Sequence, residues 1–509
     1  MRILIFHGYL LRGTGSNIYN ASLVRALVRL GHEVHLLCQD RHADQLDFVD
    51  AVASWSGGQM ELRTLREPVR CTAYRPDIGG VLPVYVADRY EGFRAVPFPE
   101  LDDEALERYL DANVAAVREV AERAVPDVAL ANHLVMGPAI VARAVGGRVP
   151  YAVKVHGSAL EYTVKPSPER FMPYAREGLD QASAVLVGSR HTAESLWEAM
   201  GDPELPARTR LGPPGVDTDT FRPRPPEEAA AELEALAVRL AGGQAAGWGG
   251  EAGAAAALRA LDPVREEIVT YVGKLIVSKG VDLLIAAWPL VCDRVPNARL
   301  CVVGFGTYRD ALGQLAGALR DGDFDAARDI AARGRELEGG PRSELGYLRA
   351  FLDTVDDDYL RAARGAFERA HFTGRLEHDD LPPLLVNASA QVVPSTFPEA
   401  FGMVAAEAAA CGALPLSAAH SGLAEVSRRL QEAVDEDLRP LLSFELGPRA
   451  VEEIAEKLSA WLTLDSGRRA RAAAALSELA RALYGWEGVA RGVIAAAEGR
   501  LDELAEPAA

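Results

Sequence analysis

The sequence of 509 residues has little of what marks secreted, metal-binding or membrane-spanning proteins. It contains only five cysteines, and no two of them stand in the C-x-x-C spacing of a zinc or redox site. We therefore expect buried, reduced thiols. No stretch reaches the roughly 18 consecutive apolar residues of a membrane span, and the N-terminal apolar run is too short for a signal peptide. These absences predict a cytoplasmic protein.

Basic residues are too few for a protein that binds nucleic acid. Lysine and arginine number 54 against 73 acidic residues, so the net charge is −19. Proteins that bind DNA or RNA usually carry a basic surface, so we expect no nucleic-acid partner. A phosphorylated small molecule stays open as a ligand, because a few local cations suffice to bind it.

The length and the order of predicted elements indicate two domains. A single hydrophobic core stops growing at roughly 250–300 residues, and this chain has 509. Its first half opens with a strand at 2–6, a loop with Gly13 and Gly15, and a helical pattern to Leu30. The loop does not have the order G-x-G-x-x-G, so a dinucleotide site has little support.

Two later strands of the first half end in polar residues. The strand at 128–131 leads to Asn132 and His133, and the strand at 149–155 leads to His156. The carboxyl ends of parallel strands meet at one edge of a sheet, where such folds bind ligands. We predict His156 as a site residue, and we leave His133 open between a site role and a structural one.

The second half repeats the pattern of the first. A strand at 268–272 leads to a loop at 273–280 and to a helix from Val281 to Pro289. Lys274 and Lys279 are the only cations of this loop. We therefore expect an α/β protein of two doubly wound, Rossmann-like parallel-sheet domains that face a central cleft, with the ligand between them.

The stretch 394–412 combines a strand end, a loop and an alanine-rich helix. Glu399 falls in the loop and Glu407 in the helix, and the backbone N–H groups of about 401–404 form the helix N-terminus, which attracts anions. Carboxylates on either side of an anion site suit a ligand with hydroxyls at both ends and phosphate in the middle, such as a nucleotide sugar. Taken alone, two glutamates at this spacing are a weak signal, and an alanine-rich buried helix is the alternative.

Embedded in Pro-Ser-x-x-Pro-Glu-x-Phe-Gly, this stretch resembles the retaining glycosyltransferases of GT-B type, glycosyltransferase family four (glycosyl transferases group 1). The loop 273–280 is similar to the family's Gly-Arg-x-x-x-x-Lys-Gly diphosphate clamp, with Lys274 in place of arginine. Such a lysine keeps the charge but loses the bidentate contact. The segment 212–223 resembles the family's interdomain signature, with Pro214 in place of asparagine.

The resemblance implies transfer of a sugar from a nucleoside-diphosphate sugar to an acceptor hydroxyl, with retention of configuration and without a metal or cofactor. Its implied catalytic residues are His156, Lys274, Lys279 and Glu399. The residues implied to bind the donor are Gly13, Gly15, Gly304, Arg375, Leu376, Ala400, Phe401, Gly402, Met403, Val404 and Glu407. Among them, Glu407 is implied to bind the ribose hydroxyls. Glu399 is implied to bind the hydroxyls of the sugar.

The resemblance also divides the chain. It implies an acceptor-side domain over 1–221 with a returning C-terminal helix at about 484–505, and a donor-binding domain over 222–483. The segments 224–262 and 309–370 have no counterpart, and we interpret them as insertions. Acceptor contacts are expected from variable loops at roughly 40–100, and a homodimer stays open.

Two kinds of alternative function stay open. A GT-B sugar phosphorylase or a sugar-nucleotide epimerase would use the same cleft, and a phosphorylase would require phosphate instead of a nucleotide sugar. A catalytically silent sugar-nucleotide-binding protein is the other alternative. The presence of His156, Lys279, Glu399 and Glu407 speaks against it, because a silent protein is free to lose them.

Overall fold

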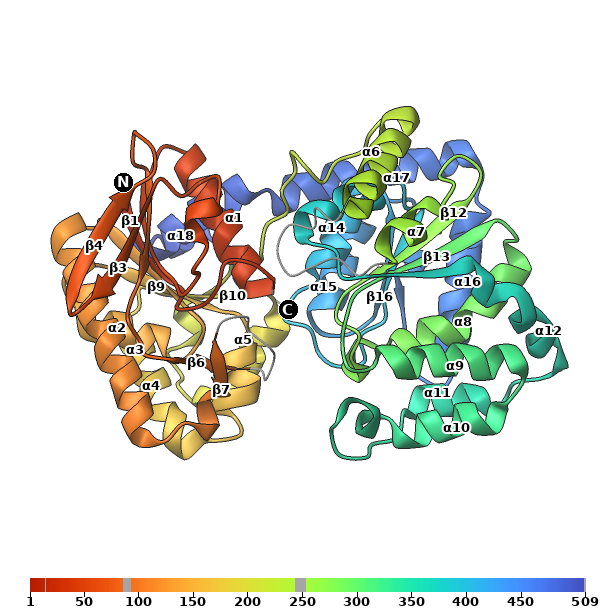
Figure 1. Cartoon of the computed structure of the whole chain (residues 1–509), viewed down its shortest axis with the longest axis horizontal. Coiled ribbons are helices and arrows are strands. Elements are labelled where there is room, and N and C mark those ends of the chain that lie inside the picture. The colour runs from red at the N-terminus through yellow and green to blue at the C-terminus, as the bar shows by residue number, and fades with distance from the viewer. Residues whose placement is uncertain (14, 86–92, 243–252, 508–509) are drawn as a thin grey trace. The chain divides into compact units, whose positions relative to one another are not determined.

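The computed structural model describes residues 1–13, 15–85, 93–242 and 253–507. The chain divides into two compact units, shown in Figure 1. Unit 1 comprises Met1–Gly215 and Tyr484–Ala509, and unit 2 comprises Val216–Leu483. Each unit is an α/β structure built on its own mainly parallel sheet, which confirms the predicted α/β class with two parallel-sheet domains.

In the described part of unit 1, nine strands form one sheet in the order β11-β10-β9-β8-β1-β2-β5-β3-β4. All neighbours are parallel except the hairpin of β3 and β4. The strands are β1 (Arg2–Phe6), β2 (Glu33–Leu37), β3 (Ala51–Ser56), β4 (Gln59–Thr64), β5 (Cys71–Arg75), β8 (Val128–Asn132), β9 (Tyr151–Val155), β10 (Ala184–Val187) and β11 (Thr209–Leu211). A separate parallel pair consists of β6 (Val81–Val84) and β7 (Arg94–Pro97).

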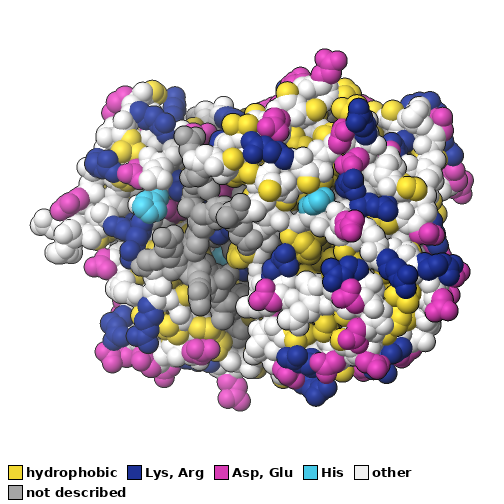
Figure 2. Space-filling model, turned by 45° about the vertical axis from the view of Figure 1, so that its right-hand side comes forward, with side chains coloured by type: hydrophobic (Ala, Val, Ile, Leu, Met, Phe, Trp, Pro, Cys, Tyr) yellow, Lys and Arg dark blue, Asp and Glu magenta, His cyan; other side chains and the backbone are white. Residues whose placement is uncertain are grey.

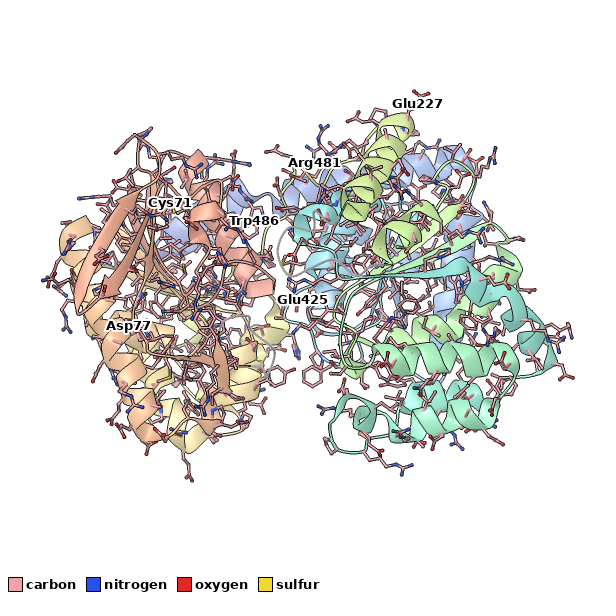
Figure 3. The ribbon with its side chains drawn as sticks, in the orientation of Figure 1. Cys71, Asp77, Glu227, Glu425, Arg481 and Trp486 are labelled. Atoms are coloured by element: carbon pink, nitrogen blue, oxygen red, sulfur yellow. The ribbon has the colours of Figure 1, made fainter. Side chains whose placement is uncertain are left out.

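Helices cover both faces of this sheet. They are α1 (Gly15–Arg29), α2 (Asp103–Ala124), α3 (Gly137–Val145), α4 (Pro168–Asp180), α5 (Arg190–Met200) and α18 (Trp486–Ala497). Successive residues of a strand point to opposite faces, so Phe6 of β1 joins the core with α2 and α3, and Ile5 joins the core with α1 and α18. Trp486 begins α18 (Figure 3) and packs edge-on against Tyr19 of α1 at 5.4 Å between ring centroids. The C-terminal helix is thus part of the core of unit 1.

The described part of unit 2 contains a parallel sheet in the order β14-β13-β12-β15-β16-β17. Its strands are β12 (Glu267–Val272), β13 (Ala298–Val303), β14 (Ala370–Gly374), β15 (Ala390–Val393), β16 (Leu414–Ala418) and β17 (Ser443–Phe444). Its helices are α6 (Pro226–Ala241), α7 (Ala254–Arg259), α8 (Val281–Arg294), α9 (Arg309–Asp321), α10 (Phe324–Arg333), α11 (Gly346–Leu352), α12 (Asp357–Ala366), α13 (Pro382–Leu385), α14 (Met403–Cys411), α15 (Ser421–Gln431), α16 (Ala450–Leu462) and α17 (Ser466–Tyr484).

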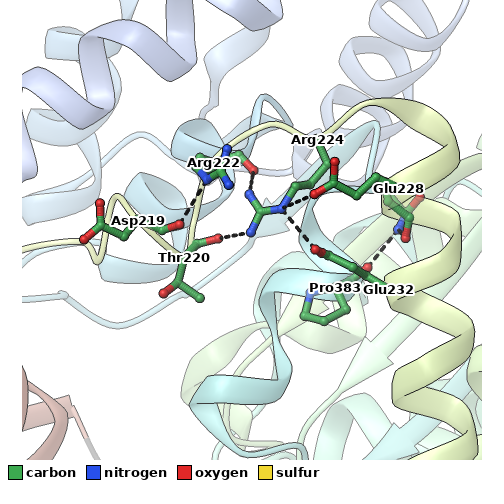
Figure 4. Close-up of polar contacts among 9 residues, drawn as sticks. Asp219, Thr220, Arg222, Arg224, Glu228, Glu232 and Pro383 are labelled. Carbon is green, nitrogen blue, oxygen red and sulfur yellow. Dashed lines mark hydrogen bonds and ion pairs between the residues drawn. The ribbon is translucent and has the colours of Figure 1, made fainter.

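Arg224 ties the first residues of unit 2 to helix α6 (Figure 4). Its guanidinium donates to the carbonyl of Arg222 at 2.7 Å and to that of Thr220 at 3.1 Å. It also forms ion pairs with Glu232 at 3.2 Å and Glu228 at 3.8 Å, both on α6. The Arg224 side chain is only 8% exposed, so this arginine is packed within unit 2, although its two acidic partners reach the surface.

The structure corrects the predicted end of α8. The sequence predicts that this helix ends at Pro289, but it continues to Arg294. A proline inside a helix removes one backbone hydrogen bond and crowds the preceding turn. Here Trp288 and Val291 on either side of it are fully buried, and this packing outweighs that cost.

The sequence supports predictions about membrane-spanning segments and about basic surface. None of the helices there is both long enough and apolar enough to cross a bilayer. On the face shown in Figure 2, basic and acidic side chains are interspersed, and no wide basic patch is visible on that face. Residues 243–252, within the segment 224–262 that we interpret as an insertion, lie outside the described residues.

Candidate active site

The loop between β12 and α8 carries the two predicted cations, Lys274 and Lys279. Its last turn, Val277–Lys279, is a 3-10 turn that ends at Gly280. Gly280 has a φ of 64°, and a Cβ atom there would lie 2.0 Å from the carbonyl oxygen of Pro394. Only glycine fits this approach. It allows the loop to pack directly against the end of β15.

Backbone hydrogen bonds hold this loop from two sides. The N–H of Leu275 donates to the carbonyl of Phe305, which follows β13, at 2.8 Å. The N–H of Thr396, which follows β15, donates to the carbonyl of Ser278 at 2.9 Å. The backbone that carries Lys279 is therefore fixed between the segments that follow two neighbours of β12.

Lys279 and Glu399 form an ion pair, so the structure brings together two of the four predicted catalytic residues. The hydroxyl of Ser395 also donates to Glu399 Oε1 at 2.6 Å. Burial by itself raises the pKa of Glu399, but the charge and hydrogen bond of Lys279 and the bond from Ser395 outweigh it, and the pKa lies below its usual value. The side chains of Lys279 and Glu399 are 31% and 25% exposed, so a ligand can reach this ionised pair.

Glu399 also lies at the start of helix α15. Its backbone N–H donates to Ser421 Oγ at 2.9 Å, and its carbonyl accepts from the N–H of Gly422 at 3.0 Å. Helix α14 begins at Met403, so the predicted helix start at 401–404 is confirmed. The N–H groups of a first helical turn lack partners within the helix and lie at the positive end of its dipole.

Glu407 is almost fully buried, at 2% exposed, and contacts a residue that the sequence analysis missed. Its Oε1 lies 2.7 Å from Nε2 of His378. Burial by itself lowers the pKa of His378, but the carboxylate of Glu407 outweighs it and the net shift is upward. The His378 ring packs on Phe221 at 5.1 Å between centroids. His378 comes shortly after the carboxyl end of β14, and that position is the signal that could have found it.

The remaining predicted donor residues of unit 2 follow β13 and β14. Gly304 comes directly after β13, and its N–H donates to the carbonyl of Gly374 at 2.9 Å. Arg375 follows β14, forms an ion pair with Glu377 at 3.1 Å and lies 5.1 Å from the centroid of the Phe305 ring. Leu376 is buried. Gly304 therefore follows the strand next to β12, which carries the lysine loop, and Arg375 and Leu376 follow the strand beyond it.

In unit 1, the predicted residue His156 belongs to a buried network of polar side chains. Its Nε2 lies 2.8 Å from Oδ1 of Asn132. The amide nitrogen of Asn132 donates to the carbonyl of Phe6 at 3.1 Å and to Asn20 at 2.8 Å, which fixes the amide so that His156 donates to it. Burial and the neighbouring His133 lower the pKa of His156 well below its usual value. His156 is therefore neutral, with its proton on Nε2.

His133 is also buried, and it has a positive φ of 69°. Among the described residues, neither of its ring nitrogens has a hydrogen-bond partner. Its ring lies 4.9 Å from that of His156 between centroids, and burial lowers its pKa well below the usual value. The predicted loop glycines of this unit follow β1, whose carboxyl end lies beside that of the parallel strand β8. Gly13 precedes α1, and Gly15 begins it.

Lys154 is a buried cation that the sequence analysis missed, because it falls within an apolar strand. Its side chain is enclosed, with Nζ donating to the carbonyl of Gly212 at 2.6 Å and lying 5.4 Å from the centroid of the Tyr19 ring. Burial lowers the pKa of Lys154 to about 7.

Asp282 lies in the first turn of α8, just after the lysine loop, and its burial leads us to expect a pH-dependent stability. It is 3% exposed, and burial raises its pKa from 3.8 to about 7. Between these values the unfolded chain binds fewer protons than the folded one, so the free energy of unfolding falls as the pH rises, by up to ~1.4 kcal/mol per pH unit. We expect Asp282→Asn to raise the unfolding temperature at pH 8 and to change it little at pH 4.

Thermal unfolding followed by circular dichroism at several pH values checks this expectation. The exposed Asp310 on α9 is the matched control, because Asp310→Asn removes a carboxylate in the same unit without burial. An Asp282→Asn variant that shows the same pH dependence as the unmodified protein would contradict the assignment.

Among the described residues, no cluster of three or more histidine, cysteine or acidic side chains is placed to hold a metal ion. All five cysteines are buried and unpaired, as the composition predicts.

The chain matches two family models. One is described as a glycosyl transferase 4-like domain and matches residues 14–215. The other is described as glycosyl transferases group 1 and matches residues 259–323 and 358–475. The unmatched residues 324–357 lie inside the segment that we interpret as an insertion at 309–370.

Relatives and solved structures extend over nearly the whole chain. It is 27% identical to a D-inositol 3-phosphate glycosyltransferase of Xylanimonas cellulosilytica over 491 residues, 94% of this chain and 90% of that protein. Its fold is similar to that of a sucrose-phosphate synthase from Thermosynechococcus elongatus, with a TM-score of 0.58 and 19% identity over 99% of this chain and 98% of that one. It is also similar to that of the Anabaena protein HepE in complex with UDP and glucose, with a TM-score of 0.55 and 17% identity over 99% of this chain and 100% of that one.

At such identities the two solved structures show a shared fold, and the family rests on the two models. Together they match more than half of the residues and include the lysine loop and the stretch from Glu399 to Glu407. The resemblance that these motifs carry is therefore confirmed. The chain belongs to the glycosyl transferases of group 1.

Proposed function

We propose that this protein transfers a sugar from a nucleoside-diphosphate sugar to an acceptor hydroxyl, with retention of the anomeric configuration and without a metal or other cofactor. The observation that carries the proposal is the reachable ion pair of Lys279 and Glu399 at the carboxyl ends of β12 and β15. A cation, a fixed carboxylate and two helix starts around it suit a ligand that has both phosphate and sugar hydroxyls.

The positive groups of unit 2 suit the leaving group of this reaction. Cleavage of the donor releases a nucleoside diphosphate, so negative charge develops on its oxygens and has to be stabilised. Lys274 and Lys279 supply positive charge there, and the N–H groups at the start of α14 supply hydrogen-bond donors. Glu399 binds hydroxyls of the transferred sugar, and Glu407 binds the ribose hydroxyls. The neutral His156 of unit 1, whose N–H is engaged by Asn132, accepts a hydrogen bond from a sugar hydroxyl at Nδ1.

Retention follows from attack on the face that the diphosphate leaves. The bond between the anomeric carbon and the phosphate oxygen breaks, and the bond to the acceptor oxygen forms. The proton of the acceptor hydroxyl passes to the departing phosphate oxygen. Glu399 is engaged by Lys279 and Ser395, which suits contact with hydroxyls better than covalent attack on carbon.

The named relatives suggest which substrates to test first. HepE was solved with UDP and glucose, and the relative from Xylanimonas is named for D-inositol 3-phosphate. We therefore propose a uridine-diphosphate sugar as the donor and a phosphorylated cyclic polyol as the acceptor. We propose a cytoplasmic location, which the unpaired cysteines support.

A donor screen tests the proposed function. A ligand that binds the folded state raises its unfolding temperature by mass action. Among UDP-glucose, GDP-mannose and ADP-glucose, we expect UDP-glucose to raise the unfolding temperature most. We also expect it to be consumed when inositol 3-phosphate is added, at the same rate in EDTA. A requirement for inorganic phosphate would indicate a phosphorylase. Stabilisation without turnover would indicate a silent binding protein, and stabilisation by none of the donors would refute the proposal.

A further inference from the structure

The segment that interrupts the family match reaches back to the lysine loop. Glu338 lies in this segment, which covers 324–357. Its Oε2 accepts a hydrogen bond from the backbone N–H of Val277 at 2.8 Å, across 61 positions of sequence. Val277 is the first residue of the 3-10 turn that ends with Lys279. The first N–H groups of such a turn have no partner within it, so a carboxylate there completes the turn.

The turn that presents Glu338 is itself held in place. It covers Arg335–Glu338 and is flanked by Gly334 and Gly339, which both have positive φ. A Cβ atom on Gly334 would lie 1.8 Å from the carbonyl oxygen of Ser343, so only glycine allows the closure of this loop. The loop that follows α10 is therefore closed on itself, and this closure fixes the position of Glu338.

The Glu338 side chain is largely enclosed, at 12% exposed. Its other oxygen, Oε1, lies 3.3 Å from Nε of Arg335 on the same turn. One oxygen thus faces an arginine of the inserted segment and the other faces the lysine loop. The carboxylate of Glu338 therefore connects the inserted segment to the lysine loop, and each of its oxygens has a partner within the protein.

Contacts within the lysine loop link the position of Val277 to the ion pair of Lys279 and Glu399. The next residue, Ser278, accepts the N–H of Thr396, and Lys279 pairs with Glu399. A change in the turn at Val277 therefore moves the two groups that the proposed reaction needs. Glu338 lies in the part of the chain that the family model does not match, so this support is a property of this chain.

We propose that Glu338 is a positioning residue: the inserted segment uses its carboxylate to hold the turn 277–279 and so to place Lys279 for the diphosphate of the donor. The expected effect of Glu338 on donor binding rests on the proposed function. The expected effect of Glu338 on the turn 277–279 does not depend on that function. A carboxylate that instead occupies an anion site would compete with the donor, and its removal would tighten donor binding.

Hydrogen exchange of the full chain, without ligand, tests the structural part. We expect faster exchange in peptides that cover 273–280 for Glu338→Ala. The amide of Glu338→Gln keeps a hydrogen-bond acceptor without the charge, so this variant should be intermediate. Peptides of α11 should not change. The matched control is Glu336→Ala, on the same turn, because Glu336 is exposed and pairs with Arg333 at 3.2 Å. This control should exchange like the unmodified protein.

Steady-state kinetics with UDP-glucose, or with whichever donor the screen identifies, test the functional part. We expect the KM for the donor to rise about tenfold in Glu338→Ala, the loss typical of a hydrogen bond to a charged group. We also expect a smaller rise in Glu338→Gln and none in Glu336→Ala. In a Lys279→Ala background, measured by calorimetry with the same donor, Glu338→Ala should weaken binding little further.

The outcomes separate this inference from the proposed function. If no donor binds or reacts, the proposed function fails, and the exchange of 273–280 still decides whether Glu338 holds the loop. Unchanged exchange of 273–280 in both variants would overturn the inference, as would a fall in KM. If exchange becomes faster to the same extent in α10, α11 and the loop 273–280, Glu338 only stabilises the inserted segment. That result would also overturn the inference.

Discussion

Replacing Lys279 with alanine is expected to lower the rate of sugar transfer by about 10²–10³-fold, and to lower hydrolysis of the donor equally, while the fold is preserved. Removal of one group that stabilises developing negative charge has costs of this size in other enzymes. The change also removes the cation that pairs with Glu399, so burial is offset less and the pKa of that carboxyl rises, although the hydrogen bond from Ser395 remains. Initial rates with the identified donor, with and without acceptor, measure both effects.

The chain offers a matched control for this variant. It contains only five lysines, and two of them are in the loop 273–280. Lys457 on α16 is in the same unit but pairs with Glu453 at 3.0 Å, outside the site described above. Lys457→Ala should keep full activity. Normal turnover by Lys279→Ala, with a normal unfolding temperature, would exclude the assigned role.

The second large effect is expected at Glu407. Glu407→Gln should raise the KM for the donor by about 10–100-fold, because a hydrogen bond to a charged group contributes roughly 1.5–3 kcal/mol and each 1.4 kcal/mol is tenfold. The carboxylate also holds the pKa of His378 above its usual value, and this support is lost in the variant. Steady-state kinetics at varied donor concentration measure the change.

A donor analogue turns this into a test of the contact itself. If Glu407 binds the ribose hydroxyls, a donor that lacks the 2′- and 3′-hydroxyls should bind weakly to the unmodified protein, and Glu407→Gln should weaken its binding no further. Glu432→Gln, an exposed glutamate of the same unit that pairs with Arg429, is the control. Equal losses for both donors in Glu407→Gln would show that Glu407 does not contact the ribose.

The sequence allowed the central pair to be predicted because its parts are short motifs with fixed spacing. Lys279 follows one strand and Glu399 follows another, and parallel strands bring their carboxyl ends to one edge. The sequence also places Glu399 just before α14, but it does not predict the contact of Glu399 with the start of α15. The direct ion pair between Lys279 and Glu399 depends on side-chain packing, which the spacing of the motifs does not specify.

Contacts between residues far apart in the sequence were out of reach of sequence patterns for definite physical reasons. His378 contacts Glu407 across 29 positions, and Glu338 contacts Val277 across 61, so neither pair leaves a local periodicity. Lys154 is a single charged residue within an apolar strand. The apolar pattern predicts the strand but does not indicate that the lysine is buried. In unit 1, the region 40–100 was expected to form variable loops, but it contributes strands β3, β4 and β5 to the main sheet.

The most direct measurement follows the reacting carbon itself. The donor identified by the screen, labelled with ¹³C at its anomeric carbon, is incubated with the protein and the acceptor and observed by NMR. We expect the label to appear in a glycoside with the anomeric configuration of the donor, one nucleoside diphosphate released per glycoside, and the same course in EDTA. A product of inverted configuration, or a label that moves only when inorganic phosphate is added, would contradict retaining transfer from a nucleotide sugar.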